Sequence, residues 1–157
     1  MIKGVEIKEL KALTDERGFL MEMLRRDDPV FEKFGQVYVT CCKYGVAKAW
    51  HYHKEQTDHF VTVFGKALVV LYDMREDSPS KGEVQEFVLE APPSKKTVLL
   101  KIPKQVAHGF TATEKEEARI INVPTLTYNY DTPDEYRFPW DSQEIPYKWP
   151  SFVTSGG

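Results

Sequence analysis

The chain has 157 residues, of which 41% are hydrophobic and 29% are charged, and its formal net charge is −3. This composition excludes an intrinsically disordered chain, and no apolar run is long enough to span a membrane. The slightly acidic balance also argues against a nucleic-acid-binding protein, which needs a basic face. We therefore expect a single globular domain over residues 1–157, long enough to bury a core without disulfides or metal.

The elements predicted along the chain are short β-strands. Runs rich in Val, Ile, Phe, Tyr and Thr alternate with clusters of Gly, Pro, Asp and Lys, as is typical of a β-sandwich or barrel. One segment, 27–34, is predicted to form a single helical turn. The predicted strands are 5–10, 18–24, 36–44, 47–53, 59–72, 84–89, 97–102, 107–113 and 119–123.

The domain is expected to have four parts. Residues 1–46 carry the N-terminal strands, and residues 47–124 form the core of a jelly roll or β-barrel. Residues 125–150 are dense in proline, aromatic and acidic side chains, and we expect an ordered tail that packs on the barrel. Residues 151–157 are expected to be frayed. The predicted fold class is therefore all-β, with short helical turns and an ordered C-terminal tail.

The two cysteines are neighbours, Cys41 and Cys42, and adjacent cysteines rarely form a disulfide. Reduced thiols, together with an N-terminal segment that lacks the apolar stretch of a signal peptide, favour the cytoplasm.

All four histidines lie in two predicted strands, which is the feature on which the functional interpretation depends. His51, His53 and His59 are close together, and His108 belongs to the second segment. Imidazole suits proton transfer near neutral pH and is also a common metal ligand. Because side chains two apart share a face of a strand, His51 and His53 should point together, and Lys48 should point the other way. The sequence predicts one polar pocket.

Three chemistries fit this histidine pattern. The spacing G-x5-H-x-H-x4-D-x6-G over residues 45–65 resembles the first motif of the cupin superfamily, and the segment around Pro103 and His108 resembles the second. In a metal cupin this resemblance implies that His51, His53, Asp58 and His108 bind iron, manganese, zinc or nickel. The second chemistry is metal-free acid–base catalysis by one histidine. The third is a set of strand histidines that bond to backbone groups.

A longer pattern runs through nearly the whole chain. Its stretches are DERGF at 15–19 with Glu22, HY at 51–52, DMR at 73–75 with SP at 78–79, IP at 102–103 with AHGF at 107–110, and NY at 129–130 with Glu135, Trp140 and WP at 149–150. In this order they resemble the dTDP-4-dehydrorhamnose 3,5-epimerase family, a metal-free branch of the cupins that acts on nucleotide-sugars. The resemblance implies neither a metal nor a cofactor.

The resemblance also implies a reaction. The ketone of a nucleoside diphosphate-4-keto-6-deoxyhexose acidifies neighbouring C–H bonds, a histidine removes a proton, and reprotonation inverts the carbon. His51 occupies the base position, and His53 is taken with it as catalytic. The residues implied to bind substrate are Arg17, Glu22, Gln36, Lys48, His59, His108, Asn122 and Glu135. Such an enzyme serves surface polysaccharide synthesis, including lipopolysaccharide, or deoxysugar synthesis.

Three positions depart from the family pattern. Asp58 stands where the family has a lysine for the enolate oxygen, and His59 or Lys48 are the available substitutes. Asn122 stands where the family has a tyrosine acid, with the tail residues Tyr128 and Tyr130 as substitutes. The aspartate that follows W-P in the family is missing.

These departures leave alternatives to a 3,5-epimerase. A nucleotide-sugar 3,4-ketoisomerase could use His51 and His53 on one face of the sugar ring and needs no acid on the opposite face. A non-catalytic sugar-nucleotide binding protein and a metal-dependent cupin are the others. We expect a homodimer in each case, because such domains protect their sheet edges by pairing.

Overall fold

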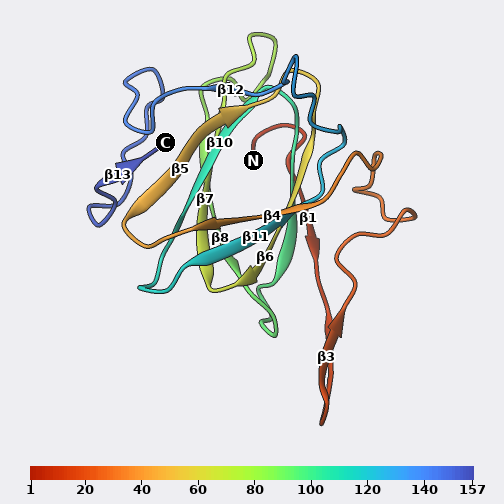
Figure 1. The fold of residues 1–157 in the computed structure, drawn as a ribbon. Helices are drawn as coiled ribbons and strands as arrows, with labels where there is room; N and C mark the ends of the chain where they lie inside the picture. The colour runs from red at the N-terminus through yellow and green to blue at the C-terminus, as the bar shows by residue number, and fades with distance from the viewer.

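The computed structural model describes residues 1–157, which form two facing β-sheets, a separate two-stranded hairpin and no helix (Figure 1). The first sheet has the strand order β1-β9-β6-β11-β4, and the second has the order β12-β5-β10-β7-β8, with β13 pairing with β5. The predicted all-β fold is confirmed, and the sheets do not close into a barrel. The strands are β1 (Glu6–Glu9), β2 (Ala12–Asp15), β3 (Gly18–Met21), β4 (Tyr38–Cys42), β5 (Val46–Tyr52), β6 (Asp58–Phe64), β7 (Lys66–Asp73), β8 (Val84–Glu90), β9 (Val98–Ile102), β10 (Val106–Ala112), β11 (Ala118–Asn122), β12 (Tyr136–Arg137) and β13 (Ser155–Gly156).

Each predicted strand segment contains a strand, but the long segment 59–72 is divided into β6 and β7. Gly65 separates them with a φ of 67°, a conformation that side chains with a Cβ rarely adopt. A Cβ there would also lie 2.3 Å from the carbonyl oxygen of Glu117. The sequence prediction missed β2, β12 and β13, which are short or lie in segments without apolar alternation.

The predicted helical turn at 27–34 is wrong, and this segment forms separate turns. The Asp28 N–H donates to the carbonyl oxygen of Arg25 at 3.1 Å, and the Phe31 N–H donates to that of Asp28 at 3.0 Å. Between them stands Pro29, which has no N–H to continue the pattern.

The main core lies between the two sheets and contains 15 buried residues, including Leu71, Phe110 and Ile120. A second cluster forms on the outer face of the six-stranded sheet, where Trp50 packs against Trp140 and Trp149 of the tail. The Trp50 Nε1–H donates to the carbonyl oxygen of Trp140 at 3.2 Å. The aromatic residues of the tail therefore cover a sheet face.

The expectation that residues 151–157 fray is not met in the structure. Ser155 and Gly156 form β13, which runs parallel to β5, and the Gly157 N–H donates to the carbonyl oxygen of Ala47 at 3.1 Å. Phe152 stacks on Tyr44 with ring centroids 4.8 Å apart. The open edge of β5 supplies the unpaired backbone groups that hold the tail.

The hairpin of β2 and β3 pairs only with itself and projects away from the sheets (Figure 1). Its apolar side chains are exposed, with Leu13 at 56%, Phe19 at 48% and Leu20 at 61%. The structure has no helix of the length and hydrophobicity that crossing a membrane requires.

Candidate active site

A cavity of about 680 Å³ lies between the sheets and collects most of the polar groups that face inward. Strand β4 of one sheet and strands β5 and β10 of the other line it, together with Phe60 and residues 126–137 of the tail. This volume is typical of sites that bind small molecules.

Pairing between β5 and β10 brings two predicted site histidines together. His108 lies opposite His51 in the strand register, with ring centroids 6.2 Å apart. Gly109 permits this approach, because a Cβ at that position would lie 2.3 Å from the Cβ of Ala49. The strand pairing therefore fixes the spacing of the two imidazoles.

A β-bulge in β5 corrects the predicted orientation of Lys48. His108 pairs with His51 and Phe110 pairs with Lys48, so two steps along β10 match three along β5. The extra residue reverses the alternation, and Lys48 lines the cavity with His51 while Trp50 is buried on the outer face. The Lys48 Nζ donates to Thr40 Oγ1 at 2.8 Å, which connects the two sheets across the cavity.

His51 is held in the neutral form. Burial disfavours its charged ring, and nearby basic side chains, first His108 and then Arg137, act in the same direction, so its pKa is lowered to about 3. Its Nε2 lies 3.9 Å from Glu135 Oε1, which is too long for a hydrogen bond. A neutral imidazole with an unengaged nitrogen is available to accept a proton.

Asp58 is the buried anion of the site, with 1% of its surface exposed. Its Oδ1 accepts hydrogen bonds from Gln56 Nε2 at 2.9 Å and from Asn122 Nδ2 at 2.8 Å. Its Oδ2 faces the Nε2 atoms of His53 at 3.2 Å and His108 at 3.4 Å. Burial alone would raise the pKa of Asp58, but the hydrogen bond and charge of His53 lower it to about 2.

His53 is the cation that balances Asp58. Its Nε2 faces Asp58, and its Nδ1 meets the carbonyl oxygen of Asp134. Burial alone would lower its pKa, but the bond to Asp58 outweighs burial and raises it to about 9. His53 lines the cavity, as the sequence suggested, but both of its nitrogens are engaged.

Three of the four ligands that the metal hypothesis names come together in the structure. The ligand atoms of His53, Asp58 and His108 lie within 4.8 Å of one another, and His51 is outside this group. Two imidazoles and a carboxylate match the nitrogen and oxygen donors of divalent metal sites. Here, however, each oxygen of Asp58 already faces two nitrogen atoms, and His53 would have to lose its proton first. The contacts describe a hydrogen-bonded charge cluster.

Four residues implied to bind substrate lie in the cavity lining, namely Gln36, Lys48, His108 and Glu135. Glu135 forms an ion pair with Arg137, whose Nη2 lies 2.6 Å from Oε1 of the carboxylate. Basic side chains therefore surround the ring of His51, and they come from three strands: Lys48 from β5, Arg137 from β12 and His108 from β10.

Two implied binding residues have structural positions instead. His59 is completely buried on the far side of β6, where its ring nitrogens lie 2.8 Å from the carbonyl oxygen of Val123 and 3.0 Å from that of Val30. Asn122 is also completely buried and lies behind the cavity wall. The predicted contact of His59 with substrate is therefore wrong, and Asn122 acts through the side chains that it holds.

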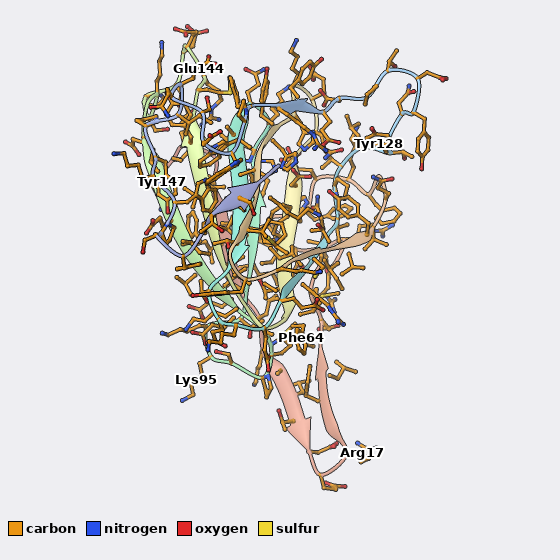
Figure 2. The ribbon with its side chains drawn as sticks, turned by 60° about the vertical axis from the view of Figure 1, so that its left-hand side comes forward. Arg17, Phe64, Lys95, Tyr128, Glu144 and Tyr147 are labelled. Carbon is orange, nitrogen blue, oxygen red and sulfur yellow. The ribbon has the colours of Figure 1, made fainter.

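Arg17 and Glu22 do not reach the cavity of their own chain. The Arg17 side chain is 83% exposed and pairs with Asp15, and Glu22 pairs with Arg25 at 3.0 Å. Figure 2 shows Arg17 at the tip of the projecting hairpin, at the opposite end of the molecule from Tyr128, which belongs to the cavity rim.

Sequence reasoning missed several lining residues, among them Tyr38, Thr40, Gln56, Asp134 and Arg137. Alternation along the predicted strand 36–44 contained a signal for two of them, because Gln36, Tyr38 and Thr40 are two apart. The tail residues Asp134 and Arg137 lie in a segment without such periodicity, so nothing in the sequence pattern placed them at the site.

Comparison with known proteins shows the family of this chain. The model of the family described as dTDP-4-dehydrorhamnose 3,5-epimerase matches residues 1–156. The chain is 43% identical over 149 residues to the spore coat polysaccharide biosynthesis protein SpsL of Bacillus subtilis, covering 95% of this chain and 97% of the relative. It is 40% identical over 155 residues to the probable low-salt glycan biosynthesis epimerase Agl13 of Haloferax volcanii, covering 94% of each.

The fold is similar to that of a solved relative. A crystal structure of a dTDP sugar isomerase from Desulfovibrio desulfuricans G20 superposes with a TM-score of 0.87 at 34% sequence identity, covering 94% of this chain and 92% of that one.

Proposed function

Because the chain belongs to the dTDP-4-dehydrorhamnose 3,5-epimerase family, we propose that it is a nucleotide-sugar epimerase that acts on a 4-keto-6-deoxyhexose nucleotide. The observation that carries this proposal is the neutral, unengaged imidazole of His51 among cationic groups in a cavity of about 680 Å³. Two relatives named for polysaccharide and glycan biosynthesis support a place in the synthesis of a surface polysaccharide.

His51 is the proposed base. The lone pair of its free nitrogen takes a proton from the carbon next to the ketone. The electrons of the C–H bond then form a C=C bond, and the carbonyl electrons move to oxygen to give an enolate. General bases of this kind must lie within hydrogen-bonding reach of the proton that they remove. The step transfers protons only, so the proposed reaction needs no redox cofactor.

The low pKa of His51 suits this role once the substrate is bound. In the free protein, burial and, after it, basic neighbours lower the pKa of His51 and keep the ring neutral over the physiological range. The diphosphate and the developing enolate bring negative charge to the same neighbours, which removes much of that repulsion and favours the protonated ring. The proton affinity of His51 therefore rises as the enolate forms.

Lys48 is the proposed partner of negative charge on the substrate, in place of the family lysine whose position Asp58 occupies. Its Nζ uses one hydrogen for Thr40 Oγ1 and keeps two for a ligand. Asp58 itself would repel an enolate, but its ion pair with His53 balances that charge inside the protein.

We also propose that the protein is a homodimer in which the β2–β3 hairpin contacts a second copy. The exposed Leu13, Phe19 and Leu20 lie on an arm that pairs only with itself and whose base packs on its own chain through Met21. Large exposed apolar groups of this kind mark interaction surfaces. A dimer would give Arg17 a route to the partner's cavity, which it does not reach in its own chain.

The dimer is tested by replacing Phe19 with aspartate. We expect the variant to sediment as a monomer, because a charge on the arm must be desolvated in the interface. Sedimentation velocity of wild type and variant at equal concentration is the measurement, and Glu16→Ala at the same hairpin is the control. A wild-type protein of about 18.2 kDa in solution would refute the dimer.

The proposed activity is tested by incubating the protein in D₂O with dTDP-4-keto-6-deoxyglucose and following the C3 and C5 protons by NMR. We expect deuterium at one or both carbons, together with an epimerised product. A ligand that binds without exchange would instead identify a binding protein. A product whose ketone has moved to C3 would identify a 3,4-ketoisomerase, for which His53 would have to be released from Asp58 as a second base.

A further inference from the structure

Tyr38 faces the cavity from the sheet opposite the one that carries His51. It begins β4 of the five-stranded sheet, whereas His51 lies on β5 of the six-stranded sheet, and both line the same cavity. Tyr38 and Thr40 point inward, and Val39 between them is 62% exposed on the outside. A ligand between the sheets therefore presents one face to His51 and the other to Tyr38.

The hydroxyl of Tyr38 is positioned by Asn122, which occupies the paired position on β11. The Asn122 Nδ2 donates to Tyr38 Oη at 2.9 Å and to Asp58 Oδ1 at 2.8 Å, so both of its amide hydrogens are used. The Asn122 Oδ1 accepts from the His59 N–H at 3.0 Å. Because the phenol oxygen accepts a hydrogen bond here, its own hydrogen is free to be donated to a ligand.

The surroundings of Tyr38 favour the protonated form of its hydroxyl. Burial and the nearby carboxylate of Asp58 raise the pKa of Tyr38 to about 12, although the Asn122 bond acts in the opposite direction. The same amide would stabilise the phenolate that remains after the proton leaves.

We propose that Tyr38 is the catalytic acid on the face of the hexose opposite His51. This inference rests on the proposed epimerase function. After His51 has taken the C–H proton, the C=C electrons of the enolate take the phenolic proton of Tyr38, a new C–H bond forms on the opposite face, and the ketone is restored. The O–H electrons remain on Tyr38 as phenolate. Proton exchange with solvent then returns Tyr38 to phenol and His51 to neutral imidazole.

The tail tyrosines suggested by the sequence are less well placed for this role. Tyr130 is 90% exposed, whereas the 40% exposure of Tyr128 is close to the 42% of Tyr38, so the hydrogen bond from Asn122 is what distinguishes Tyr38. The two tail rings contact each other with centroids 5.1 Å apart. Neither hydroxyl has a partner that fixes its orientation. The family position for a tyrosine acid holds Asn122, and the structure pairs that asparagine with the hydroxyl of Tyr38 from the neighbouring strand.

The test is Tyr38→Phe, assayed in D₂O for two signals. We expect formation of epimerised product to fall by roughly 100-fold or more. Deuterium exchange with retained configuration should persist, because His51 can still remove a proton and return a deuteron on its own face. His51→Asn, in contrast, should lose both signals. Only an acid that acts on the opposite face predicts this separation between exchange and inversion.

The control is Tyr44→Phe, which removes a hydroxyl from a tyrosine that stacks on Phe152 outside the cavity. Its epimerisation rate should equal that of wild type. If Tyr38→Phe epimerises as fast as wild type, the inference is wrong even though the proposed function stands. If wild type neither exchanges nor epimerises the sugar, the proposed function itself fails.

A second substitution covers the case in which Tyr38→Phe does not fold. Incorporation of 3-fluorotyrosine at position 38 retains the hydroxyl and lowers its pKa, so the alkaline limb of the epimerisation rate should move to lower pH. An unchanged alkaline limb would also contradict the role of Tyr38.

Discussion

Replacing His51 by asparagine is expected to lower the rate of solvent deuterium exchange into the sugar by roughly 10²–10⁴-fold, the usual contribution of a positioned general base. Asparagine has a similar volume but no basic lone pair, so nucleotide affinity should be retained. The measurement compares exchange by NMR with nucleotide binding by calorimetry in the same preparation. Exchange at the wild-type rate would remove His51 from the chemistry.

The pH profile of the wild-type enzyme provides a second readout of His51. A histidine with an ordinary pKa near 6.5 loses its base form as the pH falls through that value. Because burial and basic neighbours lower the pKa of His51 to about 3, its base form persists through this range. We therefore expect no acidic limb near pH 6.5 in kcat/KM that is attributable to His51. An acidic limb near 6.5 that the H51N variant lacks would contradict the structure.

Replacing Asp58 by alanine is expected to lower the free energy of unfolding by about 3–5 kcal/mol, as when one partner of a buried ion pair is removed. The change leaves His53 without its counter-ion, and it removes the acceptor of the amide hydrogens of Gln56 and Asn122. Urea denaturation at pH 6 measures the effect. Asp15→Ala, which removes an exposed ion pair at the hairpin, is the matched control and should change stability far less than Asp58→Ala, because water screens exposed ion pairs.

The ion pair also predicts how stability varies with pH. The pKa of His53 is raised to about 9, so its contribution is complete below its unfolded value near 6.5 and is lost as the pH rises through 9. The pKa of Asp58 is lowered to about 2, so its contribution is complete above its unfolded value near 3.9 and is lost as the pH falls through 2.

Asp58→Asn separates this charge effect from packing. The amide keeps the shape of the side chain and an oxygen for Gln56 and Asn122, but it carries no charge for His53. We expect wild type to lose stability between pH 6 and pH 10 and the asparagine variant to lose less. Equal losses in the two proteins would show that the His53–Asp58 pair does not account for the pH dependence.

Local patterns in the sequence were sufficient for the strands and for part of the site. The two-residue alternation at the end of β5 and just after it placed His51 and His53 on one face, and both line the cavity. The AHGF stretch placed His108 on a strand, and Gly109 allows this strand to approach β5 closely. These features depend on a residue and its immediate neighbours, which is why the order of residues reveals them.

Other site residues depend on pairing between distant segments. A β-bulge, defined only by the pairing of β5 with β10, turns Lys48 into the cavity. His59 follows the histidine pattern but points to the other side of β6, where carbonyl oxygens of Val30 and Val123 take both of its nitrogens. These contacts join residues that lie far apart in the chain, so a local sequence pattern could not reveal them.

The sequence by itself determined that this chain is all-β and related to the dTDP-4-dehydrorhamnose 3,5-epimerases, because strand alternation and short motifs are local features of the residue order. It also predicts a base at His51, which the proposed experiments test. Only the tertiary structure decided the charge states of His51, His53 and Asp58, because burial and neighbours from separate strands set each pKa. It also decided that Asn122 orients the hydroxyl of Tyr38, since this contact joins residues 84 positions apart in the chain.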